Sequence, residues 1–551
     1  MTRFRENIVK GRLSKLAYIS FFLFIMLIVR LSWIQIVKND EYGKAALRQR
    51  TREIEIYPSR GVIYDRNLIP LTNRYRVPTM FIFKDYAVNN DDTIKYISEH
   101  TSFSGKEVKK IINASSEIVE IPVSKLPSKS EQIKGVVIAD KTYRYDKNNI
   151  LAHVIGYTKK SDNTGVSGIE RVFDDELRTE DGGSLYLELD NKKRVIPGGG
   201  FSYVDNMKNA KASCVKLTID YYIQDIAEKV MNSEGKNGAV IVSDIKTGDI
   251  LAMVSRPNFE QDDIDSYLEN DDMALYNKAV QVSYPPGSLF KIVVLLAALE
   301  DDPSIANETF YCNGYEQIDD VIIKCSKQEG HGLISTKQAF AKSCNSTFIQ
   351  IGKKIGSKKI IDMAKKLGFG EKLIVTFLEE VNGNLPEGQE ILGPAIGNIS
   401  IGQGNIEVTP IQITNMMMII ANDGVRKDLS IVDSIVTEDG YTVKQFRKEN
   451  AHQVVSRESC RILQEYLREV VVNGTAKNLN LEDIGGACGK TGSAQAVLNK
   501  KEAIHGWFTG YYPEKNPKYV ITVLVEQGYS GSKSAVPIFE KIAREIFEKN
   551  R

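Results

Sequence analysis

Residues 284–299 read YPPGSLFKIVVLLAAL, a turn-forming start followed by an apolar run. The prolines and the glycine predict the beginning of a helix, and the apolar sequence after them predicts that this helix is buried. Ser288 and Lys291 lie three residues apart, so a helix places them on one face. A serine hydroxyl needs a nearby proton acceptor to become a nucleophile, and burial lowers the pKa of a lysine towards its neutral form. The stretch therefore predicts a serine nucleophile with a lysine base.

Two short motifs downstream belong with this pair. They are Ser343-Cys344-Asn345 and Lys490-Thr491-Gly492, and the second is followed by strand-like sequence at 507–511 and 519–525. Another Lys-Thr-Gly copy, residues 246–248, lies between two apolar runs and predicts only a hairpin turn. A phosphate-binding loop before Lys490 would need glycine at position 484, where the chain has isoleucine.

The ordered trio of motifs is the set found in penicillin-recognising serine enzymes. The chain resembles a class B penicillin-binding protein, a monofunctional peptidoglycan D,D-transpeptidase, over almost its whole length. Leu289 and Ser493 stand where this family often has threonine, although Ser493 keeps a hydroxyl. Further matching segments are 60–67 (RGVIYDRN), 153–157 (HVIGY), 165–170 (GVSGIE), 217–220 (LTID), 402–404 (GQG) and 409–412 (TPIQ).

The resemblance implies a catalytic role for each of four residues. Ser288 attacks the penultimate D-alanine carbonyl of a stem peptide, forms an acyl-enzyme and releases the terminal D-alanine. Lys291 is the general base, Ser343 relays a proton to the leaving group, and Asn345 holds Lys291 or the substrate amide. An amine from a neighbouring strand then accepts the acyl group and closes a cross-link.

The resemblance also implies a substrate-carboxylate site on the strand of the third motif. Lys490 supplies positive charge, which also lowers the pKa of Lys291, and Thr491, Gly492 and Ser493 bind the substrate. Backbone N–H groups of Ser288 and Ser493 form the oxyanion hole. β-Lactams are expected to acylate Ser288, and the chemistry requires no cofactor.

Several alternatives share the trio. A D,D-carboxypeptidase differs only in using water as the acyl acceptor. A β-lactam sensor or β-lactamase is less favoured because no glutamate is identified that would activate a deacylating water. A non-catalytic cell-wall scaffold would tolerate a damaged trio, whereas the trio here is intact. Cell shape, cell division and sporulation remain open as the cellular role.

The N-terminal sequence predicts a membrane anchor. Residues 16–37 are apolar apart from Arg30 and a few polar positions, and 22 residues at about 1.5 Å each cross a bilayer core. No small-x-small cleavage site follows, which favours an uncleaved single-pass anchor over a signal peptide. The positive-inside rule predicts a cytoplasmic N-terminus and an extracytoplasmic catalytic domain, because five basic residues precede the run: Arg3, Arg5, Lys10, Arg12 and Lys15.

The chain is expected to have four parts. They are a cytoplasmic tail at 1–15, a transmembrane anchor at 16–37, an elongated, non-catalytic pedestal or dimerisation-like domain at 38–212, and a transpeptidase domain at 213–551. The last is expected to be α+β, with an antiparallel sheet flanked by helices. The resemblance implies that the pedestal docks partners, including a membrane glycosyltransferase of a cell-wall synthesis complex. The 72 basic and 71 acidic residues give no signal for nucleic-acid binding.

A cysteine-histidine cluster lies just before the second motif. Cys312, Cys325 and His331 fall within twenty residues, and a predicted hairpin at 314–324 brings the two cysteines together. These side chains are good zinc ligands, so the cluster predicts a structural Zn²⁺ that braces the active-site rim. A Cys312–Cys325 disulfide and free thiols are the alternatives.

The fourth zinc ligand is less determined by the sequence. Glu329 and Asp302 are the candidates, because the acidic residues at the tip of the hairpin lie far from its base. Cys344 and Cys488 are expected to be packed thiols rather than ligands.

Overall fold

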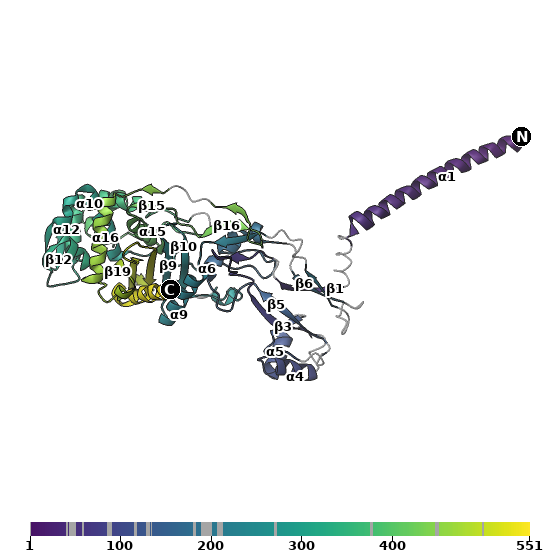
Figure 1. Cartoon of the computed structure of the whole chain (residues 1–551), viewed down its shortest axis with the longest axis horizontal. Helices are drawn as coiled ribbons and strands as arrows, with labels where there is room; N and C mark the ends of the chain where they lie inside the picture. Colours follow the sequence, from purple (N-terminus) through teal and green to yellow (C-terminus); the bar gives the residue numbers. More distant parts are fainter. Residues whose placement is uncertain are drawn as a thin grey trace. The chain divides into compact units, whose positions relative to one another are not determined.

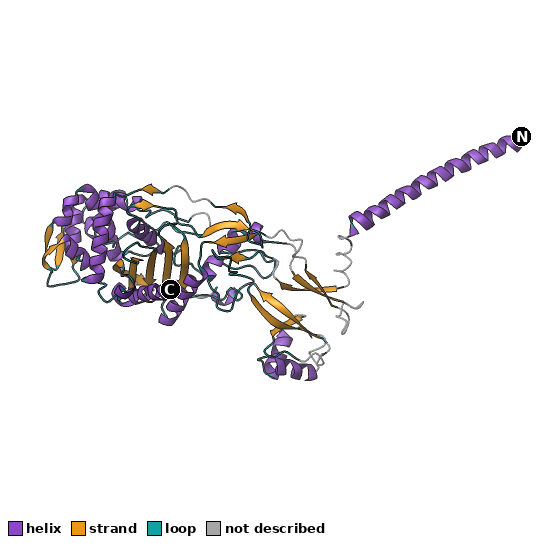
Figure 2. Cartoon of the chain, viewed as in Figure 1, coloured by secondary structure: helices purple, strands orange, loops and turns teal. Residues whose placement is uncertain are grey.

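The computed structural model describes residues 2–39, 42, 51–57, 60–84, 91–114, 118–127, 133, 135–179, 183–188, 201–205, 213–268, 273–374, 378–446, 451–498 and 501–550. The chain divides into two compact units. The first contains residues 1–59, 76–142 and 180–210, and the second contains residues 60–75, 143–179 and 211–551. Figures 1 and 2 show their helices and strands.

The first unit carries two small sheets. One has the order β1 (Thr51–Tyr57), β6 (Gly183–Glu188), β7 (Phe201–Asp205), and the other has the order β4 (Ile118–Pro122), β3 (Tyr75–Phe83), β5 (Val136–Tyr143). Successive side chains of β3 face opposite sides, as in any strand. Met80 and Ile82 pack in a core with α4 (Asp91–His100) and α5 (Gly105–Ala114), whereas Phe81 and Phe83 pack with apolar residues of β1.

The second unit is built on a five-stranded antiparallel sheet. Its order is β10 (Ile250–Arg256), β9 (Gly238–Asp244), β21 (Tyr519–Val525), β20 (Lys501–Tyr512), β19 (Cys488–Leu498). The predicted hairpin is confirmed, because β9 and β10 pair antiparallel around residues 246–248. The strand of the third motif, β19, is the edge strand beside β20.

Helices cover this sheet on both faces. Helices α9 (Tyr221–Glu234) and α17 (Val536–Asn550) pack together on one face, and α15 (Pro410–Ala421) packs on β9, β20 and β21. Helix α10 (Lys291–Asp301) is buried from Lys291 to Leu299 and packs against α12 (Asn345–Ile355), α13 (Ser357–Lys366) and α16 (Arg457–Val472). The buried helix and the α+β architecture are therefore as predicted.

Two pairs of short strands and several small elements complete this unit. β11 (Thr309–Cys312) pairs with β14 (Gly332–Ser335), and β12 (Tyr315–Ile318) pairs with β13 (Val321–Lys324). The second pair confirms the hairpin predicted at 314–324. Other short elements include α6 (Ala152–Ile155), α11 (Thr336–Ala341), α14 (Ala395–Ile399), β15 (Val425–Arg426) and β18 (His452–Gln453).

The division between the units at residues 210 and 211 lies close to the expected boundary at residue 212, but two earlier segments of the expected pedestal pack in the second unit. Strand β2 (Ile63–Tyr64) pairs in parallel with β8 (Cys214–Leu217). The two belong to a four-stranded sheet with the order β2, β8, β16 (Val432–Val436), β17 (Thr442–Gln445). Segments 60–75 and 143–179 therefore belong to the second unit, although both lie within the expected pedestal.

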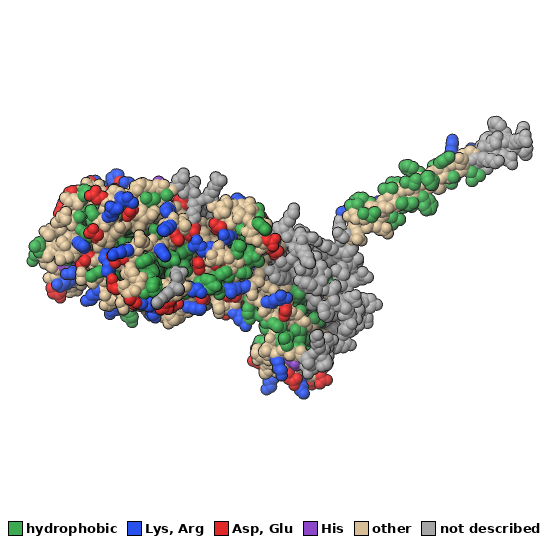
Figure 3. Space-filling model, viewed as in Figure 1, with side chains coloured by type: hydrophobic (Ala, Val, Ile, Leu, Met, Phe, Trp, Pro, Cys, Tyr) green, Lys and Arg blue, Asp and Glu red, His purple; other side chains and the backbone are tan. Residues whose placement is uncertain are grey.

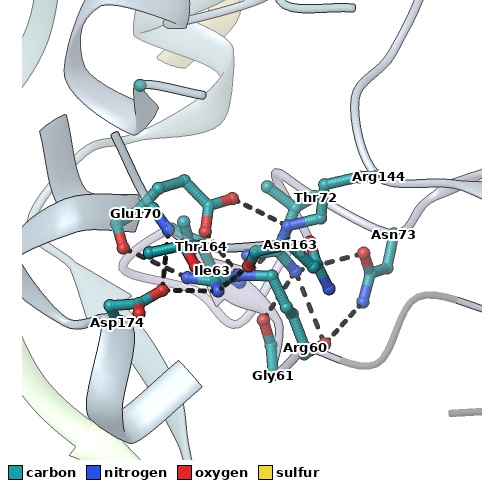
Figure 4. A network of polar contacts seen from close by, with 12 residues as sticks. Arg60, Gly61, Ile63, Thr72, Asn73, Arg144, Asn163, Thr164, Glu170 and Asp174 are labelled. Atoms are coloured by element: carbon teal, nitrogen blue, oxygen red, sulfur yellow. Dashed lines mark hydrogen bonds and ion pairs between the residues drawn. The ribbon is translucent and has the colours of Figure 1, made fainter. Parts of the chain in front are cut away.

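A buried ionic network joins these two segments (Figure 4). The Glu170 carboxylate on α7 (Gly168–Val172) accepts hydrogen bonds from Arg60 Nε at 2.9 Å and Arg144 Nε at 2.7 Å. Arg60 Nη1 also donates to Asp174, on α8 (Asp174–Leu177), at 2.6 Å, and Arg144 Nη1 donates to the Gly61 carbonyl oxygen at 2.7 Å. Because two guanidinium groups meet two carboxylates, the buried charges balance.

One N-terminal helix has the length and composition of a membrane span. Helix α1 (Thr2–Ser32) continues into a π-helical turn, η1 (Trp33–Val37), and the 27 residues Gly11–Val37 form the candidate span. None of its apolar stretch is buried inside the protein, and Figure 3 shows hydrophobic side chains along its surface. Within the part of the chain that the structure describes, it is the one helix that meets these criteria.

Candidate active site and cysteine-histidine cluster

The first motif lies where a 3-10 turn becomes a helix. Ser288 belongs to η4 (Gly287–Phe290), and Lys291 is the first residue of α10. Lys291 Nζ lies 3.2 Å from Ser288 Oγ, within hydrogen-bond reach, and Lys291 is fully buried. The predicted serine-lysine pair is therefore in contact, and Ser288 remains partly exposed.

The second motif closes around the same lysine. Ser343 lies between α11 and α12, and Lys291 Nζ donates to the Ser343 carbonyl oxygen at 2.7 Å and to Asn345 Oδ1 at 2.7 Å. The Ser343 hydroxyl is 3.1 Å from Lys291 Nζ. Ser343 has φ 56°, in the left-handed region that residues other than glycine seldom adopt. This backbone directs both its carbonyl and its hydroxyl oxygen to the lysine.

The third motif also contacts Ser343. Lys490 is fully buried on β19, and its Nζ lies 3.2 Å from Ser343 Oγ and 3.0 Å from the Thr491 carbonyl oxygen. The Ser343 hydroxyl thus lies between the two lysine amines. All five predicted catalytic residues form one connected group.

Two glycines allow the edge strand to approach the nucleophile. A Cβ on Gly492 would lie 2.9 Å from Leu289 Cγ and 3.1 Å from the Pro286 carbonyl oxygen. A Cβ on Gly287, whose φ is +53°, would lie 2.5 Å from the carbonyl oxygen of Ser493. The predicted substrate-binding residues of β19 therefore lie directly beside the Ser288 turn.

Burial controls the protonation of both lysines. It lowers the pKa of the Lys291 amine to about 8, against the opposing effect of nearby Cys344 and Cys325. Burial and the charge of Lys291 together lower the pKa of Lys490 well below its usual value. Two ammonium groups on either side of one hydroxyl repel each other, so the pair readily loses a proton.

A buried ionic cluster supports the chain segment that precedes Ser288. The Glu526 carboxylate accepts from Lys278 Nζ at 2.6 Å and from the Tyr284 hydroxyl at 2.7 Å. The Tyr284 ring packs edge-on against Trp507, whose Nε1 donates to the Pro285 carbonyl oxygen at 3.2 Å. These contacts tie residues 284 and 285 to β20 and the end of β21, and no motif in the sequence indicated them.

The predicted metal ligands also meet. Cys312 Sγ and Cys325 Sγ each lie 3.6 Å from His331 Nδ1, and Cys325 Sγ lies 3.8 Å from Cys344 Sγ. The ligand atoms of all four residues lie within 4.8 Å of one another. All six cysteines are free thiols, so Cys312 and Cys325 are not joined in a disulfide.

The fourth member of this cluster corrects the expectation from the sequence. Cys344 joins it rather than packing as an isolated thiol, because its turn between α11 and α12 lies against the base of the hairpin. Asp302 is instead the N-cap of a 3-10 turn and accepts from the Ser304 N–H, and Glu329 is exposed. Cys488 is buried on β19, outside the cluster, as expected.

Sequence reasoning also missed Thr475, which follows α16. Its hydroxyl lies 2.5 Å from the Thr491 hydroxyl, and its N–H donates to the Ala341 carbonyl oxygen at 3.1 Å. Thr475 lies 16 residues before Thr491, in a Gly-Thr-Ala segment that matches none of the three motifs. Only the packing of α16 beside β19 identifies Thr475 as a neighbour of the site.

Comparison with family models divides the chain in two. The penicillin binding protein transpeptidase domain matches residues 238–544, and the penicillin-binding protein dimerisation domain matches residues 55–198. The first match contains Ser288, Ser343 and Lys490, and it covers more than half of the 551 residues.

Curated relatives match along most of their length. The chain is 30% identical, over 98% of its length, to stage V sporulation protein D of Bacillus subtilis, of which it covers 85%. It is 25% identical, over 92% of its length, to the peptidoglycan D,D-transpeptidase MrdA of Escherichia coli K12, of which it covers 89%.

Solved structures share the fold. Pseudomonas aeruginosa PBP2, in complex with WCK 5153, matches with a TM-score of 0.63 and 23% identity, over 90% of this chain and 96% of that one. A chain from a peptidoglycan synthase complex matches with a TM-score of 0.69 and 23% identity, over 98% of each chain.

Proposed function

Because the chain belongs to the penicillin-binding protein transpeptidase family, we propose that it is a serine D,D-transpeptidase that cross-links peptidoglycan stem peptides through an acyl-enzyme on Ser288. The observation that carries this proposal is the hydrogen-bonded series Ser288, Lys291, Ser343, Lys490. It joins three motifs that lie far apart in the sequence, and a structural role alone does not require two fully buried lysines.

Acylation begins with proton transfer from Ser288 to the neutral amine of Lys291. The Ser288 oxygen then forms a bond to the penultimate D-alanine carbonyl carbon, and the backbone N–H groups of Ser288 and Ser493 stabilise the oxyanion. As the C–N bond breaks, the Ser343 hydroxyl gives its proton to the departing D-alanine amine and takes up the proton that Lys291 received from Ser288, so Lys291 becomes neutral again. Ser343 is suited to this relay because both lysine amines lie within 3.2 Å of its oxygen.

The substrate carboxylate helps to set these proton positions. Bound at Thr491 and Ser493, it places a negative charge near Lys490, and this charge raises the pKa of Lys490. A protonated Lys490 in turn disfavours a proton on Lys291. Binding of the first stem peptide therefore favours the neutral form of Lys291, which is the form that acts as the base. An amine from a second stem peptide finally attacks the acyl carbonyl carbon. Lys291 takes a proton from this amine and returns it to Ser288 Oγ as the ester C–O bond breaks.

The proposal is tested by the mass of the intact protein after treatment with a penicillin. We expect one adduct on the wild-type chain and none on Ser288→Ala. Lys291→Ala is expected to slow acylation by about 10²–10⁴-fold, as for loss of a general base. The control is Ser233→Ala, because Ser233 and Lys236 repeat the serine-lysine spacing elsewhere. An adduct that persists on Ser288→Ala would contradict the assignment.

The acyl acceptor is tested in cells. If an amine is the acceptor, depletion of the protein lowers the fraction of cross-linked muropeptides measured by mass spectrometry. A D,D-carboxypeptidase would instead raise the pentapeptide fraction without loss of cross-links. We propose that the protein works beside a membrane glycosyltransferase, since one structural relative comes from a complex described as coordinating polymerization and crosslinking.

The cysteine-histidine cluster is proposed to hold one structural Zn²⁺. A tetrahedral site with Zn–S bonds of about 2.3 Å places neighbouring sulfurs about 3.8 Å apart. The 3.8 Å between Cys325 and Cys344 and the 3.6 Å contacts to His331 fit this geometry. Contact with Cys344 also lowers the pKa of the Cys325 thiol, which favours the thiolate that metals bind. The metal would brace the turn that carries Ser343 and Asn345, and it would take no part in the chemical steps themselves.

A further inference from the structure

Two hydroxyl groups on β19 share an arrangement that the proposed function does not explain. The Thr491 hydroxyl lies 2.5 Å from the hydroxyl of Thr475, and the Ser493 hydroxyl accepts from the Gly531 N–H at 3.3 Å. Thr491 is buried, at 6% exposure, and Thr475 is half-buried. Each of the two proposed carboxylate-binding hydroxyls thus has one internal partner.

The single hydrogen of a hydroxyl gives this arrangement a direction. A threonine or serine hydroxyl donates one hydrogen bond and accepts up to two. The Gly531 N–H is a donor only, so Ser493 accepts from it and keeps its own hydrogen for a ligand. For Thr491 to do the same, Thr475 must donate the hydrogen of the 2.5 Å bond, a distance at the short end of the range for O–H···O contacts.

We infer that Thr475 is a positioning residue for recognition of the terminal carboxylate of the acyl-donor peptide, the stem peptide that acylates Ser288. It donates to Thr491 Oγ1 and so turns the Thr491 hydrogen towards the substrate. This inference rests on the proposed function, in which Thr491 and Ser493 bind that carboxylate. Thr475 itself acts through Thr491 and need not touch the substrate.

The backbone around Thr475 holds it in place for this role. A Cβ on Gly474 would lie 2.4 Å from the Ala341 carbonyl oxygen, so the chain can pass this point only as glycine. The Thr475 N–H then donates to that same carbonyl oxygen at 3.1 Å, two residues before Ser343. Thr475 therefore links the chain leading to the second motif with the hydroxyl of the third.

The test compares two thioester donors that differ in one group. One donor has a leaving group that ends in a free carboxylate, and the other has a carboxamide at the same position. In the full-length protein, Thr475→Val removes the hydroxyl and keeps the side-chain shape. We expect kcat/KM to fall by about tenfold or more for the carboxylate donor, the usual effect of losing a hydrogen bond to a charged group. The value for the carboxamide donor is expected to change by less than about threefold, and Thr475→Ser should restore discrimination between the donors.

A matched control variant and a second Thr475 variant distinguish a role in carboxylate recognition from a general effect of losing a hydroxyl pair in the sheet. Thr522→Val removes the Thr509–Thr522 hydroxyl pair, 2.9 Å apart in the same sheet, and should not alter the ratio between the donors. Thr475→Ala provides the same comparison if the valine variant does not fold. An equal loss for both donors, or no loss, would overturn the inference while leaving the proposed function intact. A wild-type protein that is acylated by neither donor would instead refute the proposed function.

Discussion

Ser343 shows how a single residue shapes this site. Its left-handed backbone costs roughly 1–3 kcal/mol for a residue other than glycine, yet the position is serine. Glycine would relieve the strain but would lose the hydroxyl that lies between Lys291 and Lys490. The strain is therefore consistent with the proposed proton relay and is held in place by the contacts of the surrounding turn.

The first prediction concerns the pH dependence of acylation. Lys291 must be neutral to accept a proton, and its pKa is lowered to about 8, so the acylation rate should rise with pH and level off above about 8. The midpoint belongs to the coupled pair, since Lys490 titrates beside it. The measurement is the second-order rate constant for a penicillin between pH 6 and 10. The melting temperature over the same range is the control for unfolding, and a flat rate profile would argue against Lys291 as the base.

At the scale of elements, local patterns were predictable and long-range contacts were not. The apolar run after Lys291 predicted α10, and residues 314–324, with acidic residues at the tip, predicted the β12–β13 hairpin, because both patterns lie within one segment. Cys344 and Thr475 were missed as members of their sites. Their neighbours are set by how α11, α12 and α16 pack against distant strands, and a single sequence does not encode that packing in any local pattern.

The second prediction is that the cysteine-histidine cluster at the base of the β12–β13 hairpin binds zinc. Elemental analysis of the purified protein is expected to find about one zinc per chain, and Cys312→Ser should lose it. Cys460→Ser is the control, because Cys460 is equally buried but lies on α16, outside the cluster. A chelator should lower the melting temperature and slow acylation, because a metal bound only by the folded chain stabilises it. A metal-free protein with a Cys312–Cys325 disulfide in peptide maps would favour the alternative.

At the scale of the whole molecule, sequence neighbours and packing neighbours differ. The dimerisation-domain match covers residues 55–198, yet 60–75 and 143–179 pack in the same compact unit as the catalytic sheet. Arg60, Arg144 and Glu170 explain how this unit forms from separate segments. A buried ion pair adds little net stability when intact, but removal of one partner leaves an uncompensated charge.

The third prediction follows from that asymmetry. Glu170→Gln leaves the two guanidinium groups with one carboxylate fewer and should lower the free energy of unfolding by about 3–5 kcal/mol. Urea unfolding of the full-length protein, followed by fluorescence of the buried Trp507, reports on the second unit. The control is Glu379→Gln, which breaks an exposed ion pair with Arg171, the residue that follows Glu170. This substitution should lower the free energy of unfolding by less than about 1 kcal/mol. Equal effects of the two substitutions would show that the network does not stabilise the unit.

The last prediction concerns the orientation of the chain in the membrane. Gly11–Val37 is the candidate span. Basic residues at positions 3, 5 and 10 precede it, and those at positions 12 and 15 lie within its first five residues. Lysine and arginine are retained on the cytoplasmic side, so everything after about residue 38 should face outwards, where peptidoglycan is assembled. A protease added outside intact protoplasts should therefore digest the second unit, and an epitope fused before residue 2 should survive. A cytoplasmic protein measured in the same samples is the control for lysis. Protection of the second unit with loss of the epitope would reverse the orientation and remove Ser288 from its proposed substrate.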